Sequence, residues 1–155
     1  MQEKLNEKYT LAVQQLEALW DPSYPEISNY ANAAAFINSV LPDINWAGFY
    51  FTRDKELYLG PFIGLPACVI LHYPKGVCWK AVIDRKTVVV DDVHAFPGHI
   101  ACDSASRSEI VVPIFKNGEV FAVLDIDSPL PARFNEEDAA GITALAKTVE
   151  KAIAQ

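Results

Sequence analysis

The chain has 155 residues and a formal net charge of −7, with 13 basic residues among 20 acidic ones. This length suits one domain with a single core, and a composition of 51% hydrophobic residues excludes a disordered chain. Nucleic acid and anionic membrane surfaces attract clustered Lys and Arg, so we expect neither as a partner. No apolar run approaches the roughly 20 residues of a membrane span, and the first ten residues carry no signal core. We therefore expect a cytoplasmic protein.

Apolar residues at helical spacing predict helices near both ends of the chain. The first is predicted over residues 5–19 and the second over 25–41, each followed by a proline that ends it. The last helix is predicted to begin after Asn135, with Asp138 three residues further on in a capping arrangement.

Alternating apolar and aromatic residues predict strands between these helices. The predicted strands cover residues 45–53, 56–64, 86–93, 108–115 and 119–127. Helices at both ends with strands between them favour an α+β fold, in which an antiparallel sheet carries the helices on one face. The opposite face is then free for a ligand pocket.

The predicted hairpin around Gly118 decides which side chains share a face. A three-residue loop, with Gly118 left-handed in a bulge, pairs Phe115 with Glu119 and places Glu109 opposite Asp125. We favour this register over a two-residue Asn-Gly turn because it produces one purely apolar face. That face is Ile110, Val112, Ile114, Val120, Ala122, Leu124 and Ile126, and the pocket face is Val111, Phe121, Val123, Glu109, Asp125 and Asp127.

Three clustered carboxylates are unfavourable unless one is protonated, hydrogen-bonded or paired with a cation. They can simply be a solvated strand end. They can also form a site that binds an ammonium group, donates a proton, or does both.

Cys102 lies in a loop of small polar residues, "HIACDSASRSE" (99–109), and four interpretations fit it. It can be a small packing residue. It can be the nucleophile of a hydrolase with His94 or His99 as base, or a zinc ligand together with both histidines and an aspartate. It can also be a redox thiol, oxidised to a sulfenic acid and resolved by Cys68 or Cys78.

Five segments resemble the free methionine-(R)-sulfoxide reductases, which are small GAF-domain enzymes. The segments are "INWAGFY" (44–50), "LGPFIGLPAC" (59–68), "GVC" (76–78), "DVHAFPGHIACDSASRSEIV" (92–111) and "GEVFAVLDIDS" (118–128). The three cysteines also follow the spacing of that family, ten and then twenty-four residues apart. The resemblance spans roughly residues 42–134, and because the chain has no internal repeat and no linker-like stretch, we expect residues 1–155 to form a single GAF domain.

The resemblance implies a role for each cysteine. Cys102 matches the catalytic thiol that attacks the sulfoxide sulfur and becomes a sulfenic acid. Cys68 matches the resolving thiol, which would form a disulfide with Cys102 that thioredoxin reduces. Cys78 matches an auxiliary thiol. The loop between Cys68 and Trp79 departs from the family pattern, which usually has a glycine at position 79, so the resolving thiol can be Cys68 or Cys78.

The same resemblance implies a substrate site. Glu109 matches the acid beside the sulfoxide oxygen, Asp125 and Asp127 match acids of the polar wall, and Trp46 and Tyr50 match aromatics around the methyl group. The implied substrate is free methionine sulfoxide and the implied assembly a homodimer; we expect no metal and no cofactor beyond thioredoxin as external reductant. The alternative is a GAF module that senses a small ligand or redox state without turnover.

Overall fold

The computed structural model describes residues 4–99 and 103–154 of the chain. The helices in these residues are α1 (Glu7–Leu19), α2 (Glu26–Val40), α3 (Val77–Asp84) and α4 (Glu136–Ile153), with a short 3-10 helix η1 (Val93–Ala95). The strands are β1 (Trp46–Arg53), β2 (Glu56–Gly64), β3 (Ile70–His72), β4 (Val88–Val90), β5 (Ser108–Lys116) and β6 (Glu119–Ser128).

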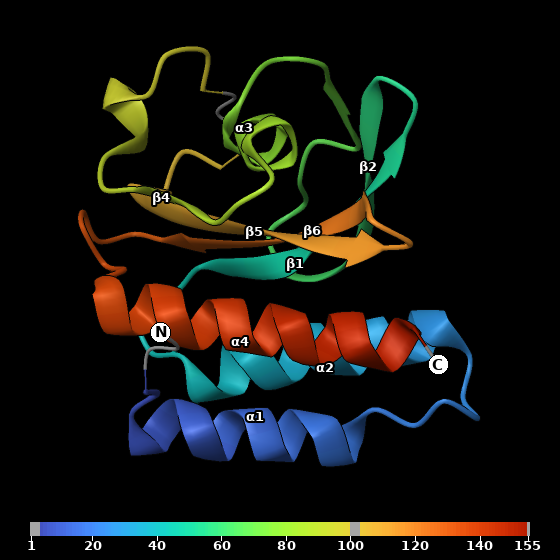
Figure 1. Cartoon of the computed structure of the whole chain (residues 1–155). Helices are drawn as coiled ribbons and strands as arrows, with labels where there is room; N and C mark the ends of the chain where they lie inside the picture. The colour runs from blue at the N-terminus through green and yellow to red at the C-terminus, as the bar shows by residue number, and fades with distance from the viewer. Residues whose placement is uncertain (1–3, 100–102, 155) are drawn as a thin grey trace.

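The strands form one antiparallel sheet in the order β3-β2-β1-β6-β5-β4. Helices α2 and α4 lie against one face, α1 packs on the outer side of these two helices, and α3 lies over the other face (Figure 1). The predicted α+β fold, with the first and last helices on the same face, is therefore confirmed. Within the described residues, no helix has the length and apolar character needed to span a membrane.

The first and last helices are joined through a buried polar contact. Tyr9 of α1 is 2% exposed and donates its hydroxyl hydrogen bond to Asp138 Oδ1 at 2.6 Å. Asp138 also completes the capping box with Asn135 at the start of α4, as the sequence predicts. Gly141, one turn further along α4, lies directly against the Tyr9 ring, so a Cβ at this position would come within 2.1 Å of it.

The hairpin between β5 and β6 differs from the predicted one. Its loop is the two-residue Asn117-Gly118 turn, both residues have positive φ, and Lys116 pairs with Glu119. The register then shifts within the hairpin, because Phe115 pairs with Val120 whereas Ile114 pairs with Ala122. The bulge therefore lies inside β6 and not in the loop.

Because of this bulge, two predictions about the hairpin are wrong: the partner of Glu109 and the face on which Phe121 lies. Glu109 lies opposite Asp127, and Asp125 lies opposite Val111, so the predicted Glu109–Asp125 pairing is wrong. Phe121 packs with the core on the helix side, whereas it was predicted on the pocket face, and Val120 is absent from the buried residues of that core. The assignment of Glu109, Asp125 and Asp127 to one face is nevertheless confirmed, since the register differs from the predicted one by two residues.

Helix α3 and strand β3 were not predicted. Helix α3 has eight residues, no side-chain cap at its start and Arg85 instead of glycine in the left-handed position at its end. The usual signals for a helix start and stop are therefore missing. Strand β3 has three residues, too few to display an alternation.

Candidate active site

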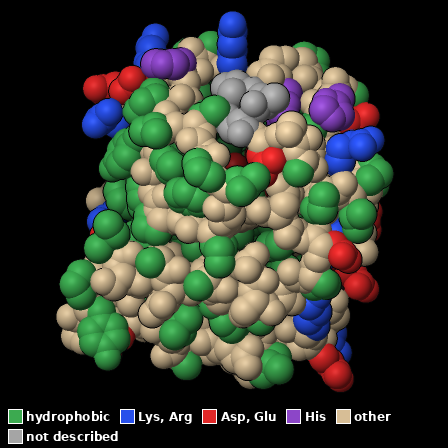
Figure 2. All heavy atoms as spheres, turned by 180° about the vertical axis from the view of Figure 1, so that it is seen from behind, with side chains coloured by type: hydrophobic (Ala, Val, Ile, Leu, Met, Phe, Trp, Pro, Cys, Tyr) green, Lys and Arg blue, Asp and Glu red, His purple; other side chains and the backbone are tan. Residues whose placement is uncertain are grey.

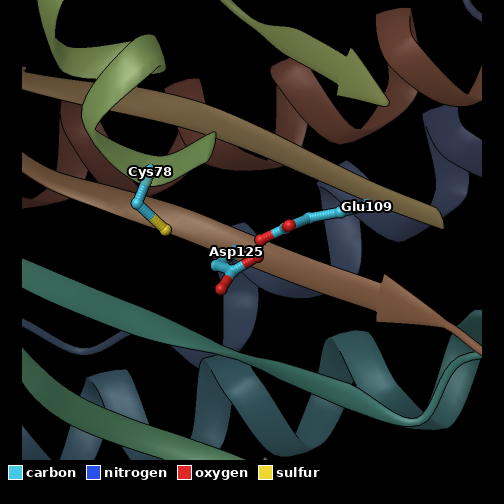
Figure 3. Close-up of side chains that lie close together, drawn as sticks. All are labelled: Cys78, Glu109 and Asp125. Carbon is cyan, nitrogen blue, oxygen red and sulfur yellow. The ribbon is translucent and has the colours of Figure 1, made fainter. Parts of the chain in front are cut away.

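Three acidic side chains meet on the face of the sheet that carries α3. Asp125 and Asp127 are two residues apart on β6 and so share a face, and Glu109 of β5 pairs directly with Asp127. Glu109 is 7% exposed and Asp125 is 6% exposed. Cys78, at the start of α3, points down towards them, so a thiol and two carboxylates face one another (Figure 3).

Burial raises the pKa of Glu109 well above its ordinary value, and the neighbouring charges of Asp125 and Asp127 raise it further. Burial also raises the pKa of Asp125 and of Asp127. Hydrogen bonds between Glu109 and the two aspartates raise the pKa of Glu109 but lower theirs. The hydrogen bonds within the cluster thus favour the proton on Glu109 over the two aspartates, which act as the acceptors.

The two aspartates keep unused acceptor atoms. Within the described part of the chain, Asp125 Oδ1 and Asp127 Oδ1 are buried and have no hydrogen-bond partner. A buried carboxylate oxygen without a partner is costly, so these atoms are suited to a ligand that donates hydrogen bonds or carries positive charge.

Two aromatic residues of β1 form a wall beside the acids. Trp46 is 2% exposed and Tyr50 is 3% exposed, and their rings stack with centroids 5.9 Å apart. The prediction that they share a face of the strand is confirmed, since both line the same pocket. Their polar atoms bind the chain that follows β2: Trp46 Nε1 donates to Leu65 O at 3.2 Å, and the Tyr50 hydroxyl donates to Cys68 O at 2.8 Å.

The cysteines differ in environment. Cys102, the predicted nucleophile, lies outside the described residues. Cys68 lies between β2 and β3 and packs, partly buried, against the core on the pocket side. Cys78 is 5% exposed, and burial together with the charges of Asp125 and Glu109 raises the pKa of its thiol well above the ordinary value. Cys78 is therefore protonated at neutral pH.

Of the two histidines in the 92–111 segment, one reaches the site. His99 Nε2 lies 3.8 Å from Glu109 Oε1, and burial and nearby His94 lower its pKa. His94 itself is exposed and is not among the residues that line the pocket.

The acids, the aromatic wall and Cys78 line one pocket. Its described lining residues are Trp46, Tyr50, Leu65, Pro66, Ala67, Leu71, Lys75, Gly76, Val77, Cys78, His99, Asp103, Ser106, Glu109, Asp125 and Asp127. Figure 2 shows acidic side chains within a hollow of the molecule.

Two polar lining residues, Asp103 and Ser106, were missed from the sequence. Asn45 Nδ2 donates to Asp103 Oδ2 at 3.0 Å and to Ser106 Oγ at 3.1 Å, which ties the segment after Cys102 to the start of β1. Ser106 also interacts with Asp127 and lowers its pKa. The sequence indicated a role for these two residues only through their position inside the 92–111 motif.

The proton on Glu109 predicts a pH dependence of stability. The unfolded chain loses this proton near the ordinary pKa of 4.5, whereas the folded protein retains it to higher pH. The free energy of unfolding should therefore fall as pH rises above about 4.5, by up to about 1.4 kcal/mol per pH unit, until the folded pKa is passed. Glu109→Gln should remove this contribution. Urea unfolding of both proteins at pH 5 and pH 7 gives the change in the free energy of unfolding between these pH values. An equal change in the native protein and in the variant would show that Glu109 is ionised in the folded state.

The six-stranded sheet with its pocket opposite the terminal helices is that of a GAF domain, and the GAF-domain family model matches residues 34–154. Free methionine-R-sulfoxide reductase of Escherichia coli is 46% identical over 128 residues, which cover 83% of this chain and 78% of that protein. The chain belongs to the GAF-domain family of free methionine-R-sulfoxide reductases.

The chain is also similar to other proteins over most of its length. Protein YtsP of Bacillus subtilis is 52% identical over 149 residues, which cover 95% of this chain and 91% of that protein. The structure of fRMsr of Staphylococcus aureus in its reduced form has a TM-score of 0.90 and 47% identity, and covers 97% of this chain and 99% of that chain. The complex of the same protein with substrate has a TM-score of 0.88 and 46% identity.

Proposed function

We propose that the protein reduces free methionine (R)-sulfoxide to methionine, with Cys102 as the nucleophile and Glu109 as the acid. The observation that carries the proposal is a carboxyl group with a raised pKa inside the pocket, since a sulfoxide oxygen must accept a proton before it can leave sulfur. The substrate complex of the Staphylococcus aureus relative and the reductase from Escherichia coli support the same reaction.

The pocket suits a free amino acid in preference to a residue within a peptide. The unpartnered oxygens of Asp125 and Asp127 can bind the substrate's ammonium group, which a peptide bond would remove. Lys75 lines the same pocket and offers positive charge to the substrate's carboxylate. Trp46 and Tyr50 supply the apolar surface for the methyl group.

The reaction moves one oxygen atom and two electrons. The Cys102 thiolate attacks the sulfoxide sulfur while Glu109 protonates the oxygen. The oxygen is then transferred from the substrate sulfur to the Cys102 sulfur: the substrate S–O bond and the transient bond between the two sulfur atoms break, methionine leaves as the thioether, and Cys102 is left as a sulfenic acid. The substrate sulfur is reduced by two electrons, and the Cys102 sulfur is oxidised by two.

A second thiol then closes the cycle. The Cys68 thiolate attacks the Cys102 sulfenic acid, which releases water and forms a Cys68–Cys102 disulfide, and a thioredoxin dithiol reduces this disulfide by exchange. The environment of Cys78 favours Cys68 for this step, because a buried thiol beside carboxylates forms little thiolate. We assign Cys78 an auxiliary role.

The proposal also covers the domain organisation, the oligomeric state and the cellular location of the protein. Residues 1–155 would form one GAF domain, which the packing of α1 and α2 into the same core as α4 supports. A homodimer would cover exposed apolar side chains of the first two helices, such as Leu11 and Ile27, which are 54% and 68% exposed. A reducing cytoplasm suits a thiol that must be regenerated in each cycle.

The reaction is tested by supplying the two epimers of free methionine sulfoxide separately, with dithiothreitol or with thioredoxin and its reductase. The R epimer should be consumed and the S epimer should remain. Binding of the R epimer without turnover, by protein that is folded and reduced, would contradict the proposal and indicate a sensor module.

Replacing Cys68 with serine should separate the chemical step from recycling. The Cys68→Ser variant should still release about one methionine per Cys102 in a single turnover, whereas thioredoxin-dependent turnover should fall by at least tenfold, because the sulfenic acid lacks its resolving thiol. Quenched-flow measurement of methionine gives the yield of the single turnover, and steady-state oxidation of thioredoxin gives the rate of thioredoxin-dependent turnover. Undiminished thioredoxin-dependent turnover would assign the resolving role to Cys78.

A further inference from the structure

Cys78, Glu109 and Asp125 lie close enough together to hold a metal ion. One ligand atom of each side chain lies within 4.8 Å of the other two, and all three residues are buried. They come from three elements, α3, β5 and β6, and Figure 3 shows the sulfur and the carboxylate groups directed towards the same space.

The donor set favours a thiophilic divalent ion. One thiolate and two carboxylates are suited to Zn²⁺, or to Cd²⁺ as its spectroscopic substitute, whereas Mg²⁺ and Ca²⁺ prefer oxygen ligands alone. Zn–S and Zn–O bonds of about 2.3 and 2.0 Å place sulfur and oxygen about 3.5 Å apart in a tetrahedral site. Side-chain movements of about 1 Å would therefore close the three ligands on an ion.

A separate observation indicates that this space accepts a ligand. Asp125 is 6% exposed, and its Oδ1 atom has no hydrogen-bond partner among the described residues. The neighbouring Asp127 Oδ1 is also buried without a partner. Metal coordination would satisfy such an oxygen and would offset the repulsion among the acidic groups of the cluster.

We propose that Zn²⁺ binds in the pocket through Cys78 Sγ and carboxylate oxygens of Glu109 and Asp125. The ion displaces one proton from Cys78 and one from Glu109, and both protons pass to solvent. No redox change accompanies this binding, and the ion is a ligand that competes with substrate and not a resident cofactor.

The proposal has a consequence for catalysis that rests on the proposed function. A bound ion occupies Glu109, the acid, and Asp125, part of the ammonium site. Zn²⁺ should therefore inhibit competitively with methionine sulfoxide, and a chelator should restore the rate. The binding itself is measured without turnover, so its failure and the failure of the reductase proposal are distinguishable.

The test uses the full chain in which Cys68 and Cys102 are both replaced by serine, so that Cys78 is the only thiol. Titration with Cd²⁺ should give an ultraviolet cadmium–thiolate band that saturates at one equivalent, and Zn²⁺ should compete for the same site. Adding Cys78→Ser should remove the band and weaken Zn²⁺ binding at least tenfold, as measured against a chromophoric chelator. Glu119→Gln, at the exposed start of β6, is the matched carboxylate control. It should leave the cadmium–thiolate band and the Zn²⁺ affinity unchanged.

Asp125→Asn, in the same two-serine background, tests the carboxylate arm. It should weaken Zn²⁺ binding at least tenfold, with near-ultraviolet circular dichroism as the check that the pocket is folded. The proposal would be overturned by saturable Zn²⁺ binding that survives Cys78→Ser, by unchanged Zn²⁺ affinity of a folded Asp125→Asn variant, or by the absence of a cadmium–thiolate band in the background protein.

Discussion

Replacing Cys102 with serine is expected to abolish the reduction of free methionine (R)-sulfoxide. Attack on the sulfoxide sulfur needs a thiolate, and a serine hydroxyl is not ionised at neutral pH and cannot form a sulfenic acid. Consumption of the R epimer with dithiothreitol should fall below detection, in a single turnover as well as in the steady state.

A neighbouring substitution provides the control for this result. Ser104 is an exposed residue of the same segment, and Ser104→Ala should retain the rate of the native protein. Calorimetric binding of methionine sulfoxide to the Cys102→Ser variant would show that its pocket is intact. Full activity of the Cys102→Ser variant would assign the attack to another thiol.

Replacing Glu109 with glutamine is expected to lower kcat by about 10²- to 10⁴-fold, the usual contribution of a general acid. Glutamine has nearly the same shape but cannot transfer a proton to the sulfoxide oxygen. The effect should fall mainly on kcat, because the ammonium group is assigned to Asp125 and Asp127.

The pH dependence gives this prediction a second readout. The raised pKa of Glu109 means that its acid form persists above pH 4.5 and is lost as pH rises through the folded value. The native rate should decline on that alkaline limb, and the Glu109→Gln variant should lack the decline. A variant that keeps kcat and raises only KM would show that Glu109 binds substrate without donating a proton.

Local patterns in the sequence were sufficient to predict the helices at the ends of the chain and the long strands. Asn135 with Asp138 predicted the cap of α4, and the observed capping box confirms it. The position of Trp46 and Tyr50 on one face followed from strand alternation alone, because side chains four residues apart in a strand point the same way.

The strand register could be predicted only in part. An Asn-Gly pair permits a two-residue turn, and nothing local reveals that a bulge follows inside β6 near Phe121. The predicted and observed pairings of Glu109 differ by two residues, which preserves the face on which a side chain lies. The predicted acid cluster was therefore correct although its pairing was wrong.

The approach of Cys78 to the acids could not be predicted from the sequence. Cys78 is 31 residues before Glu109, and the contact depends on how the uncapped helix α3 packs against β5 and β6. Trp79 contributes to that packing: it is 4% exposed and its Nε1 donates to Leu71 O at 2.9 Å. Such a contact is set by tertiary packing, which no pattern of neighbouring residues encodes.

The three acids and Cys68 are carried by different kinds of backbone. Glu109, Asp125 and Asp127 lie on β5 and β6, which are hydrogen-bonded on both sides within the sheet, whereas Cys68 lies in a connection between strands. In the proposed reaction, the residues assigned to recognition of the amino acid thus lie on paired strands that need not change during the redox cycle. The proposed resolving thiol is instead carried by a connecting segment, so a new reductant could be accommodated by altering that segment while the ligand selectivity that we assign to the sheet is preserved.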